Sequence, residues 1–395
     1  MHNMSSFQLE VISDPQALAP YLPFWRTQAP TPLQSPEWML AWWSAFASPN
    51  MQLSVLVVST EAGEVVGLAP YYLRDDWVDG RSLRFLGSGR ACGDFQTLLT
   101  AAGFEAQVGA TVGQWLMDSH ARLKWGLVEL EGLTQPDSAV AALVETLKRG
   151  RCLQHTSQLQ HTWRLDLSQG WDGFLGGLSK TQRRQTRNWV NRFDKSEHWS
   201  LCLVENEAAL PSALEKCIDL HQKRWTAVGE PGCFADARFT QFVEDAFQQL
   251  GKDQLITLAL LEDDGQPIAC HLYVNDSAGN RYMYQSGRDP DRDADGVGRI
   301  LNALAVRQAC QDGVGFIDFL RGDEPYKRRL GAAPTLCLRS RLVAPALLPR
   351  MRHGLRTIGR SVKHQVNTLR TSWNRAAGGN NLQRNIDVSQ SHVEV

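Results

Sequence analysis

Two segments of the chain alternate apolar and polar stretches in the same way. Residues 53–74 (LSVLVVSTEAGEVVGLAPYYLR) and 255–275 (LITLALLEDDGQPIACHLYVN) each contain an apolar run, an acidic turn with glycine, and a second apolar run. This order predicts a β-hairpin in each segment. An aromatic-rich helical stretch precedes each hairpin, at 35–46 in the first half and at 214–225 and 239–250 in the second. The repeated order predicts two similar α/β domains, and two unrelated hairpins are the alternative.

Further apolar runs and helical periodicities surround the two hairpins. Strands are expected at 82–88, 94–99, 126–133, 161–167, 281–287 and 315–320. Helices are expected at 105–122, 137–150, 179–195 and 297–311. Ser179 and Gln182 stand three residues apart at the start of one helix and predict a capping box there. Strands that alternate with helices predict an α/β fold with mixed β-sheets, divided into domains at 1–167 and 168–345.

A change in composition separates a tail, residues 346–395, from these domains. The tail carries eight Lys/Arg against two Asp/Glu, a local net charge of +6. Its apolar residues recur every three or four positions from Leu348 to Trp373, which predicts a basic amphipathic helix over 347–375. After Ala376 the chain is polar, which is typical of disordered segments.

The apolar stripe of this helix needs a partner surface. Three partners are open: the protein's own body, a second copy, or the inner face of a membrane. Packing on the body is the first expectation. The cations make peripheral contact with an anionic membrane the next, and Gly354 and Gly359 disfavour a long dimeric coil.

Composition and charge narrow the classes of function. The chain has 395 residues, 43% apolar and 21% charged, as ordinary globular proteins have, and a formal net charge of −1. Any attraction to nucleic acid or to an anionic membrane must therefore be local. The first ten residues lack a signal-peptide pattern, and no stretch reaches about 18 apolar residues, so we expect a cytoplasmic protein. The eight scattered cysteines form no C-x-x-C pair, which disfavours a disulfide framework or a metal site.

The stretch from 281 to 305 carries the clearest chemical pattern. A predicted strand runs into a polar loop with Gly296 and Gly298, and a helix follows. Glycines allow backbone N–H groups to approach a ligand, the helix N-terminus adds partial positive charge, and Arg299 adds a full charge. These features suit an anion such as a pyrophosphate. A G-x-G in an ordinary polar loop is the alternative.

In this order of elements the chain resembles the GNAT acyltransferase superfamily, whose loop after the fourth strand binds the pyrophosphate of acyl-coenzyme A. The segment DFLRGDEPYKRRLG (318–331) resembles the CelD/BcsL-like acetyltransferases, which are linked to cellulose and exopolysaccharide biosynthesis. Further similar segments are QSPEWMLAWW, GLAPYYL, HQKRW and SGRDPD. The resemblance covers about residues 30–345. It extends more distantly to the Fem-type aminoacyltransferases, which contain two GNAT-like domains and use aminoacyl-tRNA as donor.

The resemblance implies a tandem GNAT-like fold and an acyl-CoA donor, with acetyl-CoA first, bound mainly by the second domain. The implied donor-binding residues are Gln285, Ser286, Gly296, Val297, Gly298 and Arg299. The implied substrate-binding residues are Asp94, Arg224, Trp225, Arg321, Lys180 and Arg184. The first domain contains no comparable glycine loop, so it is expected to line the acceptor side, with Asp94 facing the cleft.

The implied chemistry centres on residues 318–331. Transfer of an acyl group requires that the acceptor lose a proton and that the departing thiolate gain one. GNAT enzymes commonly place a tyrosine after the fifth strand to protonate the departing thiolate, and Tyr326 stands at that position. Asp323 and Glu324 are candidates to orient the acceptor or act as base, and Lys327 is a candidate to hold an acidic acceptor or stabilise charge. The alternative is that Arg321, Asp323 and Lys327 form a turn-fixing ion network with Tyr326 packed.

Asp318 lies inside an apolar run, and a buried carboxylate is costly unless it is paired. Arg321 or Arg224 is the expected partner, as structural support for the cleft, and direct catalysis is the other reading. His221 and His271 are expected to be structural, as lone histidines usually are.

Another candidate is the helix at 179–195, which carries six cations and one acid. The cations are Lys180, Arg183, Arg184, Arg187, Arg192 and Lys195. They form either a solvated face or a docking face for phosphate.

The leading hypothesis is an acyltransferase that moves an acyl group from acyl-CoA to an amine or hydroxyl. The acceptor is expected to be a small molecule or a saccharide, including a cell-envelope precursor, and no metal is expected. An aminoacyl-tRNA-dependent Fem-like transferase, with tRNA as partner, is one alternative. A non-catalytic GNAT-fold scaffold in an exopolysaccharide system is the other.

Overall fold

The structure is a computed structural model that describes residues 7–91, 93–134 and 137–356. Its strands are β1 (Gln8–Ile12), β2 (Met51–Ser59), β3 (Val65–Asp76), β4 (Gly80–Phe85), β5 (Leu99–Thr100), β6 (Leu127–Leu133), β7 (Leu153–Asp166), β8 (Trp199–Val204), β9 (Ile256–Asp263), β10 (Gln266–Asn275), β11 (Arg281–Arg288), β12 (Phe316–Arg321) and β13 (Ala333–Val343). Its α-helices are α1 (Leu22–Gln28), α2 (Pro36–Phe46), α3 (Glu105–Leu123), α4 (Ser138–Arg149), α5 (Gly170–Gly177), α6 (Lys180–Asp194), α7 (Leu210–Thr226), α8 (Ala237–Gly251), α9 (Val297–Gln311) and α10 (Pro325–Arg329). The predicted mixed α/β fold is confirmed.

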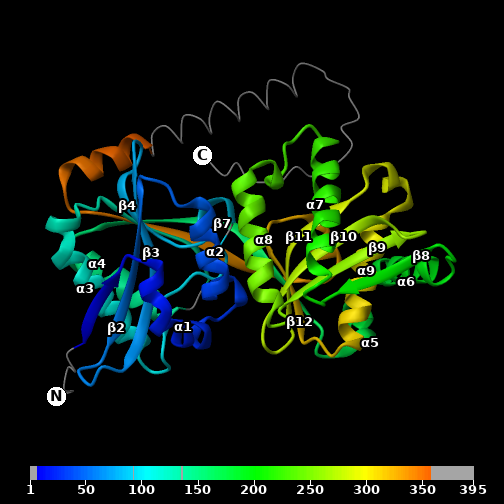
Figure 1. The fold of residues 1–395 in the computed structure, drawn as a ribbon, viewed down its shortest axis with the longest axis horizontal. Helices are drawn as coiled ribbons and strands as arrows, with labels where there is room; N and C mark the ends of the chain where they lie inside the picture. The colour runs from blue at the N-terminus through cyan, green and yellow to red at the C-terminus, as the bar shows by residue number, and fades with distance from the viewer. Residues whose placement is uncertain (1–6, 92, 135–136, 357–395) are drawn as a thin grey trace.

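The strands form one mixed sheet that runs through both halves of the molecule. Its order is β1-β2-β3-β4-β6-β13-β7-β12-β11-β10-β9-β8, with β5 beside β3. At the centre, β13 pairs antiparallel with β6 on one side and with β7 on the other. Figure 1 shows this last strand crossing between the two halves. The sequence analysis did not predict β13, and this strand joins the segments 1–167 and 168–345 into one sheet.

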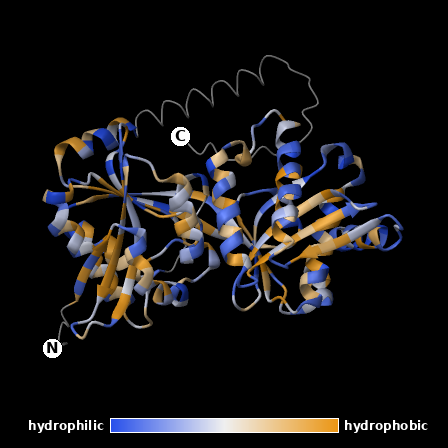
Figure 2. Ribbon diagram, viewed as in Figure 1, coloured by the Kyte–Doolittle hydropathy of each residue, from blue (hydrophilic) through white to orange (hydrophobic). Residues whose placement is uncertain are grey.

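Both hairpins predicted from the repeated pattern are present. β2 and β3 pair antiparallel in the first half, and β9 and β10 do so in the second. The aromatic-rich helices that precede them meet across the halves, since the rings of Trp38 in α2 and Phe242 in α8 lie 4.9 Å apart. One apolar core cluster therefore contains residues of both halves. Figure 2 shows the apolar residues concentrated along the strands and the inner sides of these helices.

The predicted helices of the second half are also found. Ser179 accepts the backbone N–H of Gln182, whose side chain accepts the N–H of Ser179, so the capping box of α6 is confirmed. The helix predicted at 297–311 is α9 with the same bounds.

The tail is described only at its start, where residues 347–356 are helical. The expectation that its apolar stripe packs on the body is wrong for these residues. Leu348, Met351 and Leu355 are 58%, 55% and 69% exposed, because the basic side of the helix faces the body instead. The remainder of the predicted helix and stripe, up to Trp373, lies outside the described residues, as does the polar segment after Ala376. No helix of the described ranges is long and apolar enough to cross a membrane.

Candidate active site

A gap opens in the sheet where β11 and β12 separate. These parallel strands pair only at Arg281 with Ile317 and at Tyr282 with Asp318. A β-bulge in β11 follows, since Met283 opposes Tyr273 and Gln285 opposes Leu272 on β10. Bulges bend a strand and re-aim its side chains, and they are common beside active sites. The remainder of β11, up to Arg288, therefore presents one backbone edge to an open space instead of to β12.

The bulge is held by aromatic packing from both halves. Tyr284, the extra residue of the bulge, lies with its ring 4.7 Å from that of Trp38 in α2, and stacks 6.2 Å from Phe239 in α8. Gly287 allows α7 to approach β11 closely, because a Cβ there would lie 2.4 Å from the backbone N of His221. The shape of the gap thus depends on apolar contacts that no local pattern in β11 reveals.

The predicted glycine loop borders this gap. Gly296 adopts a left-handed conformation (φ 70°, ψ 31°) at the N-cap of α9, which favours glycine. A Cβ at Gly296 would also lie 3.2 Å from the ring of Trp189 in α6. Val297 and Gly298 then begin the helix at the edge of the cavity. The N–H of Arg299 donates to the carbonyl oxygen of Gly296, whereas Val297 and Gly298 have no carbonyl partner one turn earlier in the helix. The start of α9 is thus placed beside the open space.

Arginine ion pairs hold the loop before α9 in place. Asp295 accepts hydrogen bonds from Arg192 in α6 (2.8 Å) and from Arg292 (2.8 Å). Both arginines lower the pKa of the Asp295 carboxyl. Arg192, one of the six cations of the helix predicted at 179–195, therefore has a structural partner in Asp295.

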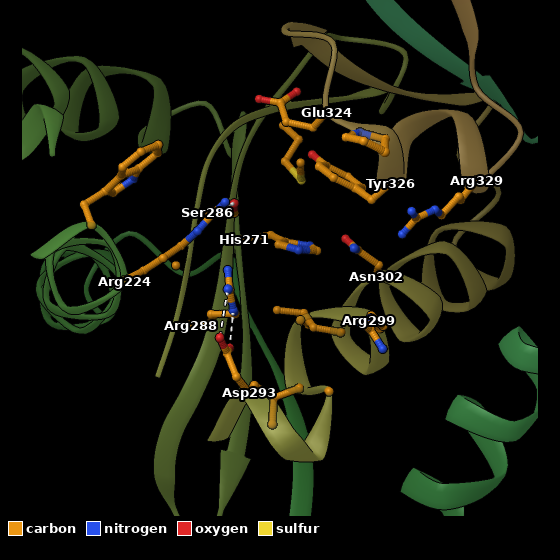
Figure 3. Close-up of a pocket in the computed structure, with 18 of the residues that line it drawn as sticks. Arg224, His271, Ser286, Arg288, Asp293, Arg299, Asn302, Glu324, Tyr326 and Arg329 are labelled. Atoms are coloured by element: carbon orange, nitrogen blue, oxygen red, sulfur yellow. Dashed lines mark hydrogen bonds and ion pairs between the residues drawn. The ribbon is translucent and has the colours of Figure 1, made fainter. Parts of the chain in front are cut away.

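The resulting cavity has a volume of about 700 Å³ and is lined from four sides (Figure 3). The helix α7 and the chain after it contribute one wall, β10 and β11 the floor, the start of α9 a second wall, and the segment of α10 a third. The lining residues that Figure 3 labels are Arg224, His271, Ser286, Arg288, Asp293, Arg299, Asn302, Glu324, Tyr326 and Arg329. Trp225, Met283 and Gly298 line it as well.

Tyr326 lines this cavity and also a smaller, adjoining one. Its ring packs edge-on against Phe319, with centroids 5.8 Å apart, and its hydroxyl end points into the cavity. Burial raises the pKa of the Tyr326 phenol well above its usual range, and the nearby Glu324 raises it further. The phenol is therefore neutral at pH 7 and retains a proton to donate.

The cavity is rich in arginine. Arg288 is bound to Asp293 through two hydrogen bonds of 2.5 and 3.1 Å, so its charge is compensated. Arg224 donates to the hydroxyl of Ser286 at 3.3 Å, and its guanidinium lies 5.4 Å from the ring of Trp225. Burial lowers the pKa of Arg224, and the charge of Arg288 lowers it further. Within the described ranges Arg224 has no carboxylate partner in an ion pair, so an anionic group in the cavity would be favoured there.

His271 lines the cavity, although the sequence indicated only a structural role. Its Nδ1 lies 2.8 Å from the hydroxyl of Tyr273, and the side chain is 4% exposed. Burial, with the charge of Arg224, lowers the pKa of His271 to about 3. The imidazole is thus neutral at pH 7. His221 does not line the cavity; burial lowers its pKa to about 4, and it contacts the side chains of Gln222 and Gln285.

The segment 318–331 divides into residues that face the cavity and residues that shape the loop. Glu324 and Tyr326 line the cavity. The ammonium group of Lys327 is instead buried beneath the loop, where it donates to the carbonyl oxygens of Leu320 (3.2 Å) and Gly322 (3.0 Å) and pairs with Glu324 (2.8 Å). The geometry gives Lys327 the role of fixing the loop.

Asp323 also lies away from the cavity. Its Oδ1 accepts the indole N–H of Trp163 at 3.1 Å and lies 3.0 Å from Nδ1 of His161, both in β7. These contacts lower the pKa of the Asp323 carboxyl despite partial burial. The interaction anchors the loop to β7, which favours the turn-fixing alternative for this residue.

Asp318 is buried, at 1% exposure, and does not line the cavity. Its partner is Arg164 in β7, whose Nε donates to Oδ2 at 3.1 Å, so the expected pairing with Arg321 or Arg224 is wrong. Burial raises the pKa of Asp318 to about 6, although the N–H of Leu320 and the charge of Arg164 act in the opposite direction.

Arg321 and Asp94 pair with each other at the junction of the halves. Asp94 is 1% exposed and faces Arg321, so it does not face the cleft as expected. Neither residue is among those that line the cavity.

A smaller, adjoining cavity lies on the other side of Tyr326. It is lined by Gln182, Gln185, Thr186 and Trp189 of α6 and shares Arg299, Asn302, Tyr326 and Arg329 with the larger cavity. The predicted binding residues Lys180 and Arg184 are exposed on α6 and line neither cavity.

Of the residues proposed from the sequence, the structure brings nine together around one cavity. They are Ser286, Gly296, Val297, Gly298, Arg299, Arg224, Trp225, Glu324 and Tyr326. Arg288, Asn302 and Arg329 line the cavity too, and the sequence analysis did not select them. Asn302 and Arg329 follow Gly298 and Tyr326 by one helical turn, and that spacing is a signal that could have identified them. Among the described residues, no group of His, Cys, Asp and Glu could hold a metal ion.

Comparison with known proteins finds one family model in the second half of the chain. Residues 180–328 match the family model described as an acetyltransferase (GNAT) domain. This range begins with α6 and ends in α10, so it contains every element that lines the cavity except the end of α10. No protein with a curated description matches the chain.

Two solved structures resemble the whole arrangement. One is a conserved protein of unknown function from Bacteroides thetaiotaomicron VPI-5482, with a TM-score of 0.54 and 11% identity, covering 85% of this chain and 100% of that one. The other is FemX, with a TM-score of 0.56 and 10% identity, covering 85% of this chain and 97% of that one. At such low identity these matches show the fold alone. The chain thus contains, in its second half, a segment that matches the GNAT domain model, and its overall fold resembles that of FemX.

Proposed function

We propose that the protein transfers an acyl group, with acetyl as the first candidate, from acyl-CoA to an amine or hydroxyl. The observation that carries the proposal is the cavity between the separated strands β11 and β12, which combines a helix N-terminus with a neutral buried phenol. The match of residues 180–328 to the GNAT acetyltransferase domain supports it.

The donor fits the cavity in a definite orientation. Its pyrophosphate suits the start of α9, where Gly298, which has no side chain, leaves the backbone accessible and Arg299 adds charge. The amide groups of the pantetheine arm match the unpaired backbone edge of β11 after Met283, as an added strand would. This orientation directs the thioester toward Tyr326.

In the reaction, the acceptor nitrogen or oxygen attacks the thioester carbonyl, the new bond forms, and the carbon–sulfur bond breaks. The departing thiolate takes a proton from Tyr326, whose raised pKa keeps the phenol protonated. The acceptor releases one proton. Glu324 lines the cavity and can accept this proton directly or through water, and the same proton, passed on through water, restores the Tyr326 phenol. His271 is a weak base, because burial lowers its pKa to about 3.

The wall formed by α7 suits the acceptor. Arg224 lies across the cavity from the start of α9, and Trp225, the next residue of α7, lines the cavity as well. An arginine beside an indole suits a polar ring that carries hydroxyl groups or an acidic substituent. A saccharide or a cell-envelope precursor, as the resemblance to the CelD/BcsL-like enzymes implies, is the acceptor class that we propose.

A thiol-release assay tests this function. Acetyl-CoA is incubated with the protein and a panel of amines, amino sugars and polysaccharides, and free CoA is measured. We expect release that depends on one acceptor class. Binding of acetyl-CoA without release in the presence of any acceptor would favour the non-catalytic scaffold instead.

An aminoacyl-tRNA-dependent reaction is the second candidate. The exposed cations Lys180, Arg184 and Arg187 lie on α6, and the other side of this helix lines the smaller cavity beside Tyr326. A tRNA whose phosphate backbone bound these cations would therefore have its acceptor end close to Tyr326. The FemX-like fold agrees with this candidate. A gel-shift assay with charged tRNA distinguishes the two: this candidate requires binding that weakens steeply as salt rises.

A further inference from the structure

Large exposed apolar side chains gather at one end of the first half. Among the described residues, eight large hydrophobic side chains are exposed, and seven of them belong to three segments that lie together. We call these seven residues the apolar end face: Trp77, Val78, Leu153, Leu347, Leu348, Met351 and Leu355. Isolated exposed apolar residues are ordinary, but a concentration of this kind marks an interaction surface.

The three segments are fixed to one another by polar contacts on their inner sides. The guanidinium of Arg356 pairs with Asp79, next to the turn that carries Trp77 and Val78. Arg350 donates to the carbonyl oxygen of Arg151, two residues before Leu153. Figure 1 shows the helix of residues 347–356, in orange, beside the tip of the β3–β4 hairpin.

The helix of the apolar end face has two distinct sides. On the inner side Pro349 lies against Gly126, and Arg356 reaches Asp79. On the outer side Leu348, Met351 and Leu355 follow one another at three- and four-residue spacing and are more than half exposed. The basic side of the helix thus contacts the rest of the protein, and its apolar side faces outward.

Two features of the apolar end face indicate which kind of surface it binds. Trp77 is 93% exposed at the tip of a hairpin, and tryptophan is the residue that membrane interfaces favour most, since its indole is both apolar and polar. Exposed cations lie at one edge of the face: Lys148 and Arg149 at the end of α4, Arg151 two residues before Leu153, and Arg350, whose guanidinium also donates to the Arg151 carbonyl. An amphipathic helix with cations beside its apolar stripe is typical of segments that lie in the headgroup region of an anionic bilayer.

We propose that the apolar end face docks on the surface of an anionic lipid bilayer. Trp77, Leu348, Met351 and Leu355 enter the headgroup region, while the surrounding Lys and Arg side chains pair with lipid phosphates. Because this inference rests on residues far from the cavity, it does not depend on the proposed acyl transfer.

Co-sedimentation of the full-length chain with vesicles tests the proposal. We expect the protein to pellet with phosphatidylcholine vesicles that contain phosphatidylglycerol at low salt, less at high salt, and little with phosphatidylcholine alone. Met351→Glu and Trp77→Ser should each weaken the partition coefficient about tenfold, since each removes one inserted apolar side chain. Gln248→Glu, which adds the same charge at an exposed position of α8, should leave binding unchanged.

Circular dichroism of each variant confirms that it is folded. Protein that stays in the supernatant with anionic vesicles at low salt overturns the proposal. Analytical ultracentrifugation then shows whether a second copy covers the face, as a dimer that Met351→Glu dissociates. Binding that both variants retain in full also overturns it, because the contact would lie elsewhere on the chain.

Discussion

Arg321, the last residue of β12, binds Asp94 through both its backbone and its side chain. The backbone N–H donates to Oδ2 and Nε donates to Oδ1, each at 2.8 Å. Nη1 of the same arginine pairs with Glu131 of β6 at 2.9 Å. Arg321, in the second half, thus forms ion pairs with two acidic residues of the first half. It directly precedes the loop that places Glu324 and Tyr326 at the cavity. The first half therefore positions the reactive loop without lining the cavity.

Asp94→Asn should destabilise the protein strongly. The substitution leaves the buried guanidinium of Arg321 with one carboxylate fewer, and loss of one partner from a buried ion pair costs about 3–5 kcal/mol. Urea denaturation measures the change in the free energy of unfolding. Glu145→Gln, which breaks exposed pairs with Lys148 and Arg149, is the control and should cost less than about 1 kcal/mol. Equal effects of the two substitutions would contradict the role assigned to Asp94.

Asp318 should make stability depend on pH between about 4 and 6. Its folded-state pKa of about 6 lies above the ordinary aspartate pKa of about 3.8, so the folded state binds the proton more tightly across that window. As the pH rises through it, the wild type should lose about 3 kcal/mol of stability relative to Asp318→Asn, and the difference should be constant above about pH 7. Urea titrations of both proteins at several pH values measure it. A difference that does not vary with pH would mean that Arg164 fully compensates the buried carboxylate.

Tyr326→Phe should lower the rate of acyl transfer by about 10²–10⁴-fold, because it removes a positioned proton donor. The affinity for acetyl-CoA should change little, since the ring and its contact with Phe319 remain. Steady-state thiol release gives the rate, and calorimetry gives the affinity. Tyr21→Phe, on the surface near Glu10, is the matched control. Full activity of Tyr326→Phe would leave the tyrosine as a packing residue, with solvent as the acid.

Arg224→Gln should raise KM for the acceptor by about tenfold or more, because a charge-assisted hydrogen bond contributes about 1.5–3 kcal/mol. The dissociation constant of acetyl-CoA should stay close to that of the wild type. Lys223→Gln, at the neighbouring exposed position of α7, removes the same charge and should have little effect on either. A weaker affinity for acetyl-CoA with an unchanged acceptor KM would place Arg224 on the donor side.

Local patterns were enough to predict the elements that depend on local chemistry. Gly296 and the helix after it were predicted because a glycine with a left-handed backbone and a helix start are sequence-local features. The capping box of Ser179 and Gln182 was predicted for the same reason. Tyr326 was selected through the resemblance to a family, and the structure places it at the cavity, although its role stays a prediction.

Side-chain contacts between residues far apart in the sequence, in contrast, could not be predicted from the sequence. Lys327 looked like a catalytic cation, but its ammonium group satisfies the carbonyl oxygens of Leu320 and Gly322 at a turn whose shape only the fold defines. Asp318 pairs with Arg164, which lies 154 positions away on a strand that neighbours it only in the sheet. The strand β13 was missed because its sequence does not alternate strictly between apolar and polar residues. Its position in the sheet depends on pairing with two neighbours, β6 and β7.

Calorimetric titration of acetyl-CoA into the wild type and Gly298→Glu tests the central claim most directly. A Cβ at Gly298 would lie 3.4 Å from Cδ of Arg288 at the cavity wall, so a glutamate there places bulk and negative charge where the pyrophosphate is proposed to bind. Gly176→Glu, at an exposed helical position with open space around it, is the control. We predict saturable binding by the wild type and the control, and none by a folded Gly298→Glu variant. Absence of binding by the wild type at millimolar acetyl-CoA, or unchanged affinity in Gly298→Glu, would contradict the account.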